Sequence, residues 1–569
     1  MIRFCGTPCR AQALRPYNRR FCLPLHLVLG VLLTGGVSFM TPVLAQEVVS
    51  RPFRVTVNSP LDGPIAPDQA LTLREAIALA NGSLSWDALS QAEQHLVVPA
   101  PSNTVVFNLP PTATTIQLQS ELPAIAQAET TLDGTTQPGF QPGLPVVTLT
   151  PAPGVAIARG LTILGDRVTV RGLNLYGFAT RQDHPEPSGD VLIMALRSSP
   201  QSAKEVGMVN VDHAPEGVAI EDNRLGYSPD GLRPTAPSDF GVVVLQAQAP
   251  MIRRNAIAHH SGSGILAHDQ AEGMEIADNR IEQNGFGAMA DGIRLTGRIA
   301  GTTLRNNTLR GNGGSAIYLF KPEGAVTIQG NTLQGNGTRL HQAAVYLMGS
   351  GHQVLDNLIQ DQNGPGVVVA AYPQSDRIAI QNNRFAQIKG LSIDLVARQH
   401  TAVTNYLAGD GPNPTRDTGN RRRDTGNGSV NTPEFLSPTF VRQGRQVNID
   451  GKADPGTTVT LYRVTEAGDR GPLSEPFLTV QTDEQGRFGA TLDTLKANDA
   501  ISAIATDPQY GTSEPALNAT IQGGDPDLVE IPMPQPRISF NPNSADPVKP
   551  IPLRVPHIVH FALDQDTLS

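Results

Sequence analysis

Short apolar segments that alternate with polar residues recur along the middle of the chain, and each ends in an asparagine. An aliphatic residue stands three positions before each asparagine, and a second apolar residue usually follows two positions after it. The segments are Ile220–Asn223, Ile252–Asn255, Ile276–Asn279, Leu304–Asn307, Ile328–Asn331, Val354–Asn357 and Ile380–Asn383. Successive asparagines are 32, 24, 28, 24, 26 and 26 residues apart. Such a period indicates a repeat architecture, and the two-residue alternation indicates that each repeat is built of strands.

One repeat reads as one coil of a right-handed parallel β-helix, with three strands, an asparagine corner, a glycine-rich turn and a return. Asparagine tolerates the left-handed backbone conformation that a sharp corner requires. Stacking of the coils places the seven asparagines in one file at a spacing of about 4.8 Å, where their amides bond one another. No six-residue period supports a left-handed helix, and propeller blades are longer, at about 40 residues.

A short helix is predicted before the repeats. Thr72 and Glu75 have the spacing of a capping box, and Asn81 with the following glycine provides a stop. The apolar side of this helix would cover the open N-terminal end of the β-helix. Arg74 and Glu75 are expected to orient this cap rather than to act in catalysis.

Residues 1–45 are typical of an export signal. Arginines precede an apolar run from about Leu25 to Phe39, and Val43 and Ala45 supply the small residues of a cleavage site. A membrane anchor is the alternative, but the run is short and is interrupted by His26 and by glycines. All three cysteines lie inside this segment, so disulfide and thiol chemistry are not expected in the mature chain.

The charge balance argues against nucleic acid as a partner. The formal net charge is −9, and removal of the signal leaves 38 basic against 52 acidic side chains, or −14. No membrane span is expected in the mature chain. Export without cysteines favours the periplasm, outer membrane or cell surface of a Gram-negative-type bacterium.

The segment 71–77 resembles the motif of the CSLREA family of exported bacterial β-helix proteins. Leu71 and Thr72 replace the family's Cys and Ser, whereas Leu73, Arg74, Glu75 and Ala76 match. Further family-like segments follow in order at 55–58, 106–108, 132–135, 170–178 and 410–433. The resemblance covers roughly residues 50–440 and implies a β-helix over residues 46–438, but it implies no particular activity.

The repeat period changes near residue 439. Strand and turn patterns over residues 439–522 resemble a bacterial immunoglobulin-like (Ig-like) sandwich, which implies a spacer or stalk. Nine prolines in residues 523–556 predict an extended linker. Residues 557–569 resemble the first strand of an OmpA-like domain, which would add peptidoglycan as a partner if such a domain follows; a frayed tail is the alternative.

The third strands of successive coils would form one sheet, whose outer side is called the lateral face here. The residues at its outward positions determine whether this face can have a catalytic site. Glycoside hydrolysis needs paired carboxylates, and a lyase needs an acidic calcium cluster beside a basic proton acceptor. The two outward rows are predicted as Leu266, Arg294, Tyr318, Tyr346, Val368 and Ser392, and as His268, Thr296, Phe320, Met348, Ala370 and Asp394. No stacked carboxylate pair occurs in them. The best catalytic candidates are Asp269, Glu272 and Asp291, in or near the adjoining turn, with Arg294; solvated turn residues are the alternative.

The same rows predict an exposed apolar patch that spans two adjacent coils. It comprises Tyr318, Phe320, Tyr346 and Met348, and such a patch marks a binding surface for sugar rings or a protein partner. The alternative is that a loop, or the return segment from Leu395 onward, packs over it. A binding patch implies that removal of both tyrosines weakens binding without lowering the melting temperature.

No cofactor is predicted, although a polar loop leaves calcium (Ca²⁺) open. The loop residues are Asp410, Asn413, Asp417, Asn420 and Asp424, whose spacing matches no known ligand scheme, and a connector is the favoured interpretation. The pair His259-His260 lacks a clustered third ligand, so a zinc site is not predicted.

Three functions remain open from the sequence. The favoured one is an exported cell-envelope protein whose β-helical surface binds glycan or protein, in an adhesive or structural role. A polysaccharide lyase or glycoside hydrolase acting on the lateral face is the rival, and a plain stalk is the third.

Overall fold

The computed structural model describes residues 52–179, 186–195, 213–287, 289–339, 341–397, 408–414 and 424–523. The predicted export signal, the Pro-rich linker beyond residue 523 and the OmpA-like segment therefore lie outside the described residues. Within the described ranges, no helix combines the length and the apolar character that a membrane span needs.

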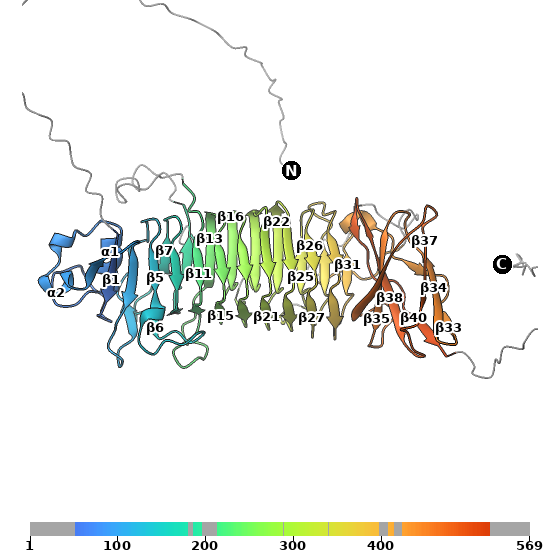
Figure 1. Ribbon diagram of the computed structural model, residues 1–569, viewed down its shortest axis with the longest axis horizontal. Coiled ribbons are helices and arrows are strands. Elements are labelled where there is room, and N and C mark those ends of the chain that lie inside the picture. The colour runs from blue at the N-terminus through green and yellow to red at the C-terminus, as the bar shows by residue number, and fades with distance from the viewer. Residues whose placement is uncertain are drawn as a thin grey trace, which may run out of the picture. The chain divides into compact units, whose positions relative to one another are not determined.

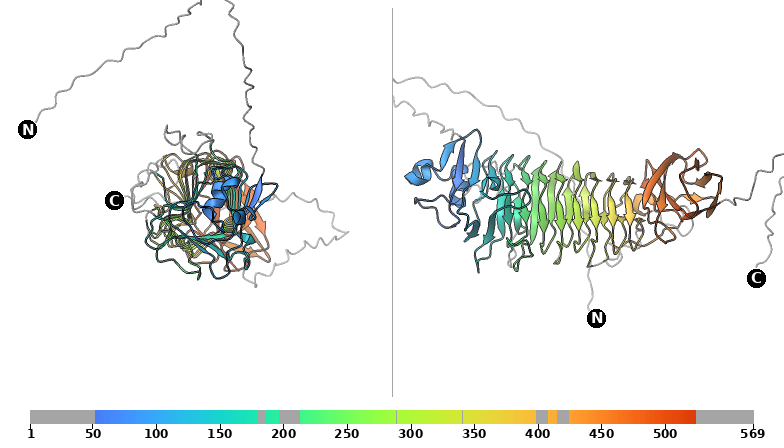
Figure 2. Two further views of the ribbon diagram at one scale, coloured as in Figure 1. Left: turned by 90° about the vertical axis from the view of Figure 1, so that its left-hand side faces the viewer. Right: turned by 60° about the horizontal axis from the view of Figure 1, so that its bottom comes forward.

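Three parallel sheets wind along the body of the chain as a right-handed β-helix, as the sequence predicts (Figures 1 and 2). The first sheet comprises β1 (Phe53–Val57), β2 (Val97–Pro99), β3 (Thr104–Phe107), β5 (Thr131–Asp133), β8 (Thr169–Arg171), β11 (Ala219–Glu221), β14 (Met251–Arg253), β17 (Glu275–Ala277), β20 (Thr302–Arg305), β23 (Val326–Gln329), β26 (Gln353–Leu355) and β29 (Ala379–Gln381). Only β2 in this sheet runs antiparallel to its neighbour, β1.

In the other two sheets, too, neighbouring strands come from successive coils. The second sheet comprises β4 (Thr115–Leu118), β6 (Val147–Pro151), β9 (Leu173–Leu175), β12 (Arg224–Leu225), β15 (Ala256–Ala258), β18 (Arg280–Glu282), β21 (Thr308–Arg310), β24 (Thr332–Gln334), β27 (Leu358–Gln360) and β30 (Arg384–Ala386). The third sheet comprises β7 (Arg159–Ile163), β10 (Gly189–Ile193), β13 (Phe240–Gln248), β16 (Ile265–Glu272), β19 (Ile293–Arg298), β22 (Ile317–Glu323), β25 (Val345–Leu347), β28 (Val367–Val369) and β31 (Ile393–Leu395).

The asparagines of the repeat form a continuous hydrogen-bonded file at the corner between the first and second sheets. The backbone N–H and the side-chain Nδ2 of Asn279 both donate to Oδ1 of Asn307, each over 3.0 Å. The Nδ2 group of Asn279 also donates to the carbonyl of Ile252. Equivalent contacts link Asn223, Asn255, Asn279, Asn307, Asn331, Asn357 and Asn383. These contacts are the stacked amides that the sequence predicts, and they satisfy buried polar groups at every corner.

A second polar file stands at the turn between the second and third sheets. Asn284 donates from its backbone N–H to Oδ1 of Asn312 over 3.0 Å, and Asn312 donates in the same way to Asn336. His260 begins this file, because its backbone N–H and its Nδ1 both contact Oδ1 of Asn284. The other ring nitrogen of His260 lies 2.8 Å from the buried carboxylate of Asp190. The imidazole therefore has a structural role in the fold.

Aliphatic side chains from all three sheets fill the interior as one buried cluster. The N-terminal end of this core is covered by α1 (Leu73–Ala80), with η1 (Trp86–Ala88) and α2 (Gln91–Gln94) after it; η2 (Gly134–Thr136) follows β5. Thr72 and Glu75 form the predicted capping box. Arg74 pairs with Asp62 over 2.8 Å and donates to two carbonyls near residue 120, so it holds the cap in place.

The remaining strands, which follow η4 (Gly426–Ser429), form a C-terminal sheet. They are β32 (Glu434–Phe435), β33 (Thr439–Gln443), β34 (Gln446–Lys452), β35 (Thr458–Val464), β36 (Glu475–Gln481), β37 (Arg487–Leu492), β38 (Ala500–Asp507), β39 (Gly511–Thr512) and β40 (Ala519–Gln522). Because β32 already pairs with β34, the sheet begins slightly before the predicted boundary at residue 438. Its Ig-like character stays a prediction.

The C-terminal sheet closes the last coil of the β-helix. Tyr462, Leu473 and Ile504 belong to the buried core of the β-helix itself. The backbone N–H of Leu473 donates to Oγ of Ser392 over 3.1 Å, and the hydroxyl of Thr512 accepts from the backbone of Ile380 over 2.8 Å. This region, which the sequence predicts as a spacer, is therefore packed as a cap that shields the end of the repeat.

Replacement of Asn307 by alanine should destabilise the fold. The substitution removes the amide contacts with Asn279, Asn331 and Ile276 and leaves buried backbone groups without partners. We expect a loss of about 3 kcal/mol in the free energy of unfolding, measured by chemical denaturation. Thr308→Ala, at the exposed next position, should change it by less than about 0.5 kcal/mol. Equal effects of the two substitutions would contradict a stabilising role for the file.

Candidate functional site

The strands of the third sheet are unusually long in the middle of the β-helix. β13, β16, β19 and β22 have 9, 8, 6 and 7 residues, whereas β25, β28 and β31 have three each. The long strands change direction where the left-handed conformation occurs, at Asp269 (φ 65°), Gly297 (φ 79°) and Lys321 (φ 45°). A Cβ atom on Gly297 would lie 2.5 Å from the carbonyl oxygen of Asp269, so this close approach requires glycine.

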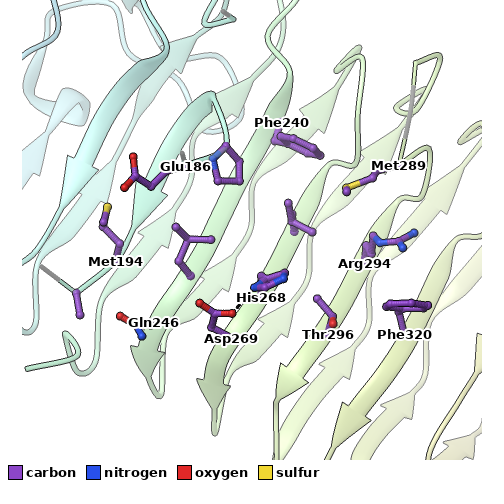
Figure 3. A pocket seen from close by; sticks show the side chains of 14 residues that line it. Glu186, Met194, Phe240, Gln246, His268, Asp269, Met289, Arg294, Thr296 and Phe320 are labelled. Carbon is purple, nitrogen blue, oxygen red and sulfur yellow. Dashed lines mark ion pairs between the residues drawn. The ribbon is translucent and has the colours of Figure 1, made fainter. Parts of the chain in front are cut away.

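A groove of about 600 Å³ lies on the outer face of these long strands (Figure 3). It is lined by side chains from β13, β16, β19 and β22 and by residues next to β10 and before β19. The lining residues are Glu186, Pro187, Met194, Ala195, Phe240, Leu245, Gln246, Leu266, His268, Asp269, Met289, Arg294, Thr296 and Phe320. The groove therefore combines aromatic and apolar surface with a small number of charged and hydrogen-bonding groups, as ligand sites commonly do.

His268 and Asp269 are in contact inside the groove. The Nδ1 atom of His268 lies 2.5 Å from Oδ1 of Asp269, and the side chain of His268 is 56% exposed. Figure 3 shows both side chains on the same face of β16. A carboxylate that contacts one imidazole nitrogen orients the ring and leaves the other nitrogen for a ligand.

Arg294 is held from two sides. Its guanidinium pairs with Asp291 over 3.0 Å, and its Cζ atom lies 4.5 Å from the ring centre of Tyr318 and 5.3 Å from that of Phe320. Asp291 is buried, and Oδ1 of its carboxylate also accepts from the backbone of Ser315 over 3.0 Å. Burial raises the pKa of Asp291 to about 6, although Arg294 and the hydrogen bond from Ser315 oppose that shift.

The structure brings only part of the predicted catalytic set together. Asp269 and Arg294 line the groove, and Asp291 supports Arg294 without lining the groove itself. Glu272 does not line it, because it lies at the far end of β16 beyond the bend at Asp269. Strand β16 continues through Asp269 and Glu272, and the adjoining turn begins at Gly273, directly after Glu272.

The predicted exposed patch is wrong for three of its four residues. Tyr318, Tyr346 and Met348 have exposed fractions of 6%, 0% and 0%, and only Phe320 is partly exposed. They pack in one cluster with Val396, which lies in the return segment after β31. Val396 continues the row of Met348 and Ala370, because the backbone N–H groups of Ala370 and Val396 donate to equivalent carbonyls of the preceding coil. Phe320 joins the groove, and the other three support its edge.

One outward row of the third sheet also differs from the prediction in register. Leu266, Arg294, Tyr318, Tyr346 and Val368 are in register as predicted, but Asp394, not Ser392, follows Val368. Ile393 lies ten residues after Asn383, as Val367 lies ten residues after Asn357. The inward residue of β31 is therefore Ile393, and its neighbour Asp394 faces outward.

Asp394 lies with residues of the predicted calcium loop. Its carboxylate accepts from the backbone of Asp410 and Gly411, while Asn413 donates to the buried carboxylate of Glu514. Burial raises the pKa of Asp394, and the neighbouring Glu514 and Asp410 raise it further. Asp417 and Asn420 lie outside the described residues. Within the part of the chain that the structure describes, no group of three His, Cys, Asp or Glu side chains could hold a metal ion.

The site residues predicted from the sequence did not include several residues that line the groove, among them Glu186, Met194, Phe240 and His268. A signal was present for His268, because it occupies an outward position directly before Asp269. The other three were not placed, because the coils between residues 180 and 250 carry long insertions that obscure the repeat.

Comparison with known proteins supports the fold. The family model for a right-handed beta helix region matches residues 214–333 and 240–407. No curated protein matches the chain.

Three solved structures illustrate the similarity. A protein of Geobacillus virus E2, ORF18, has 11% identity and a TM-score of 0.34, covering 81% of this chain and 76% of its own. A mannuronic acid specific polysaccharide family 6 lyase from human gut microbiota has 12% identity and a TM-score of 0.32, covering 64% and 78%. A periplasmic alginate epimerase has 11% identity and a TM-score of 0.28, covering 59% and 84%. These values are too low to transfer an activity.

Replacement of Tyr346 by alanine should lower the melting temperature, in contrast to the expectation from the sequence. Tyr346 is fully buried, and its ring centre lies 5.2 Å from that of Tyr318. Loss of such a side chain leaves a cavity and should cost about 3 kcal/mol or more, measured by thermal and chemical unfolding. Leu232→Ala, at a position 65% exposed, is the control and should have little effect. An unchanged melting temperature for Tyr346→Ala would contradict this burial.

The raised pKa of Asp291 should make its contribution to stability depend on pH. The folded protein retains a proton on Asp291 up to pH about 6, whereas the unfolded chain releases it near the ordinary value of 3.8. The contribution is therefore fully present below pH 3.8 and is lost as the pH rises to about 6. Relative to Asp291→Asn, the unmodified protein should become less stable across this interval in denaturation experiments. Parallel pH profiles for the two proteins would contradict the raised pKa.

Proposed function

We propose that the chain is a saccharide-binding β-helix and that the groove on its third sheet holds an extended oligosaccharide. The observation that carries this proposal is the groove itself, about 600 Å³ in volume and lined by outward side chains of several consecutive coils. Because each coil contributes one strand, the site extends along the repeat direction instead of sitting in a single loop.

The dimensions of the groove suit a chain-like ligand. Its lining runs from residues beside β10 to Phe320 on β22, which is four strand spacings, or about 19 Å. Phe240 and Phe320 offer apolar ring faces on which the C–H faces of sugars can pack. Gln246, Thr296 and His268 offer hydrogen-bonding groups for sugar hydroxyls. An aromatic surface with a few polar groups is the composition expected of a saccharide site.

The cellular setting is part of the proposal. Residues 1–45 have the pattern of an export signal, and residues 71–77 resemble the CSLREA motif. We therefore place the protein in the cell envelope or at the surface of a bacterium, where glycans are available. The Ig-like assignment of residues 439–522 and the OmpA-like assignment of residues 557–569 remain predictions, as does peptidoglycan as a partner.

A second candidate function is catalysis on the bound saccharide, as a polysaccharide lyase or glycoside hydrolase. The contact of His268 with Asp269 favours it, because a carboxylate behind an exposed imidazole is a common arrangement for a general base. Arg294 lies in the same groove. Among the described residues that line the groove, Glu186 and Asp269 are the carboxylates; Glu186 pairs with Arg159, and Asp269 contacts the imidazole of His268. This pairing supports proton abstraction over hydrolysis by two free carboxylates.

Binding should depend on the residues of the groove. A glycan array identifies a ligand, and calorimetry then measures its dissociation constant. Phe320→Ala and His268→Ala should each raise that constant about tenfold, which corresponds to about 1.4 kcal/mol. Arg310→Ala, exposed on β21 of the second sheet, is the matched control and should leave binding unchanged.

The same panel separates the two candidate functions. Release of reducing ends or unsaturated products that is lost in His268→Ala would favour catalysis. Absence of any glycan ligand, or equal loss of binding in Arg310→Ala, would contradict a saccharide site in the groove.

A further inference from the structure

Each charged or titratable side chain that lines the groove contacts a charged or titratable partner within the protein. Glu186 pairs with Arg159 over 3.1 Å, Asp269 pairs with His268 over 2.5 Å, and Arg294 pairs with Asp291 over 3.0 Å. Together these are three carboxylates, two guanidiniums and one imidazole. Their sum is therefore zero or −1, depending on whether the imidazole is protonated, and it is not positive while Asp291 is ionised.

From this pairing we propose that the groove selects an uncharged oligosaccharide and discriminates against polymers of uronic acids or other anionic sugars. The proposal rests on saccharide binding by the groove and adds the class of ligand. A site for a polyanion needs cations that are available to the ligand, and the lining offers none that lacks a protein partner.

Arg294 is the cation that an anionic sugar would have to recruit, and three contacts hold it back. Its guanidinium bonds the carboxylate of Asp291 and lies against the rings of Tyr318 and Phe320. The side chain is only 18% exposed. Withdrawal of Arg294 toward a ligand would leave the buried carboxylate of Asp291 without its counter-charge, which is strongly unfavourable.

The charged groups around the groove do not make it a site for anionic sugars. Lys321 is exposed beside the groove, with its Nζ atom 5.4 Å from the ring centre of Phe320, and it adds one positive charge that solvent screens. The chain as a whole carries a net charge of −9, which repels polyanions at long range.

The rest of the lining suits an uncharged ligand. Leu266 belongs to an apolar cluster on the outer face of β10, β13 and β16, and the partly exposed Met194, Phe240 and Leu245 pack against that cluster. Gln246 and Thr296 can exchange hydrogen bonds with hydroxyl groups without a charge. Apolar rings with neutral hydrogen-bonding groups recognise neutral sugars and give binding that depends little on salt.

The test compares two sets of oligosaccharides of equal length, uncharged hexose oligomers and uronic acid oligomers, by calorimetry on the full chain. Measurements are made at low and high salt and at a pH well above the pKa of Asp291, about 6. We expect an uncharged oligomer to bind with a dissociation constant that salt changes by less than about twofold. The uronic acid oligomers should bind at least about tenfold more weakly.

A charge-altering variant gives the sharpest control. Asp291→Asn removes the carboxylate that pairs with Arg294. The ratio of the dissociation constants for uronic acid and uncharged oligomers should therefore fall about tenfold. If that variant unfolds, Asp269→Asn serves instead, because it also removes one negative charge from the groove, at a more exposed position. Tighter binding of uronic acid oligomers by the unmodified protein, with a steep loss at high salt, would overturn the charge inference while leaving saccharide binding intact. Binding of neither set would overturn both proposals.

Discussion

The stacked amides at the corners are the constraint on which the rest of the structure depends. From Asn255 to Asn383, each asparagine oxygen accepts two N–H groups from the preceding coil, for example both donors of Asn279 at Oδ1 of Asn307. This geometry fixes the height of each coil and aligns equivalent residues of successive coils. The second file, from His260 through Asn284 and Asn312 to Asn336, repeats the constraint at another corner. Loops between the corners can vary in length because these two files hold the register.

Fixed register turns single outward residues into rows, and the rows create the candidate site. On the third sheet one row runs from Leu266 through Arg294 to Tyr318 and Tyr346. Where the strands are long, this row and its neighbours form the floor of a groove. Where the strands are short, Tyr346 and Val368 of the same row are buried in an apolar cluster that also contains Met348, Ala370 and Val396. Placement of the site thus follows from strand length on one sheet, and its charge follows from ion pairs such as that between Arg294 and Asp291.

The sequence was sufficient to predict those features of the fold that depend on the spacing of residues close together in the chain. The asparagine file, the capping box at Thr72 and the strand nature of each coil all follow from residues that are close in the chain. Burial of Tyr346 was not predictable in the same way, because it packs in a cluster with residues of other coils, Tyr318 and Val368 among them. The contact of His260 with Asp190 spans 70 residues and an insertion-rich region. The outward position of Asp394 was predictable, since the ten-residue spacing after Asn383 matches the preceding coil.

The central claim is that the outer face of the long strands holds a saccharide, and a crystal structure of the chain with an oligosaccharide tests it most directly. The account predicts sugar rings along the groove from β10 to β22, with one ring against Phe320 and a hydroxyl near the free imidazole nitrogen of His268. Electron density for the ligand on the second sheet or on the C-terminal sheet, with the groove occupied only by solvent, would contradict it.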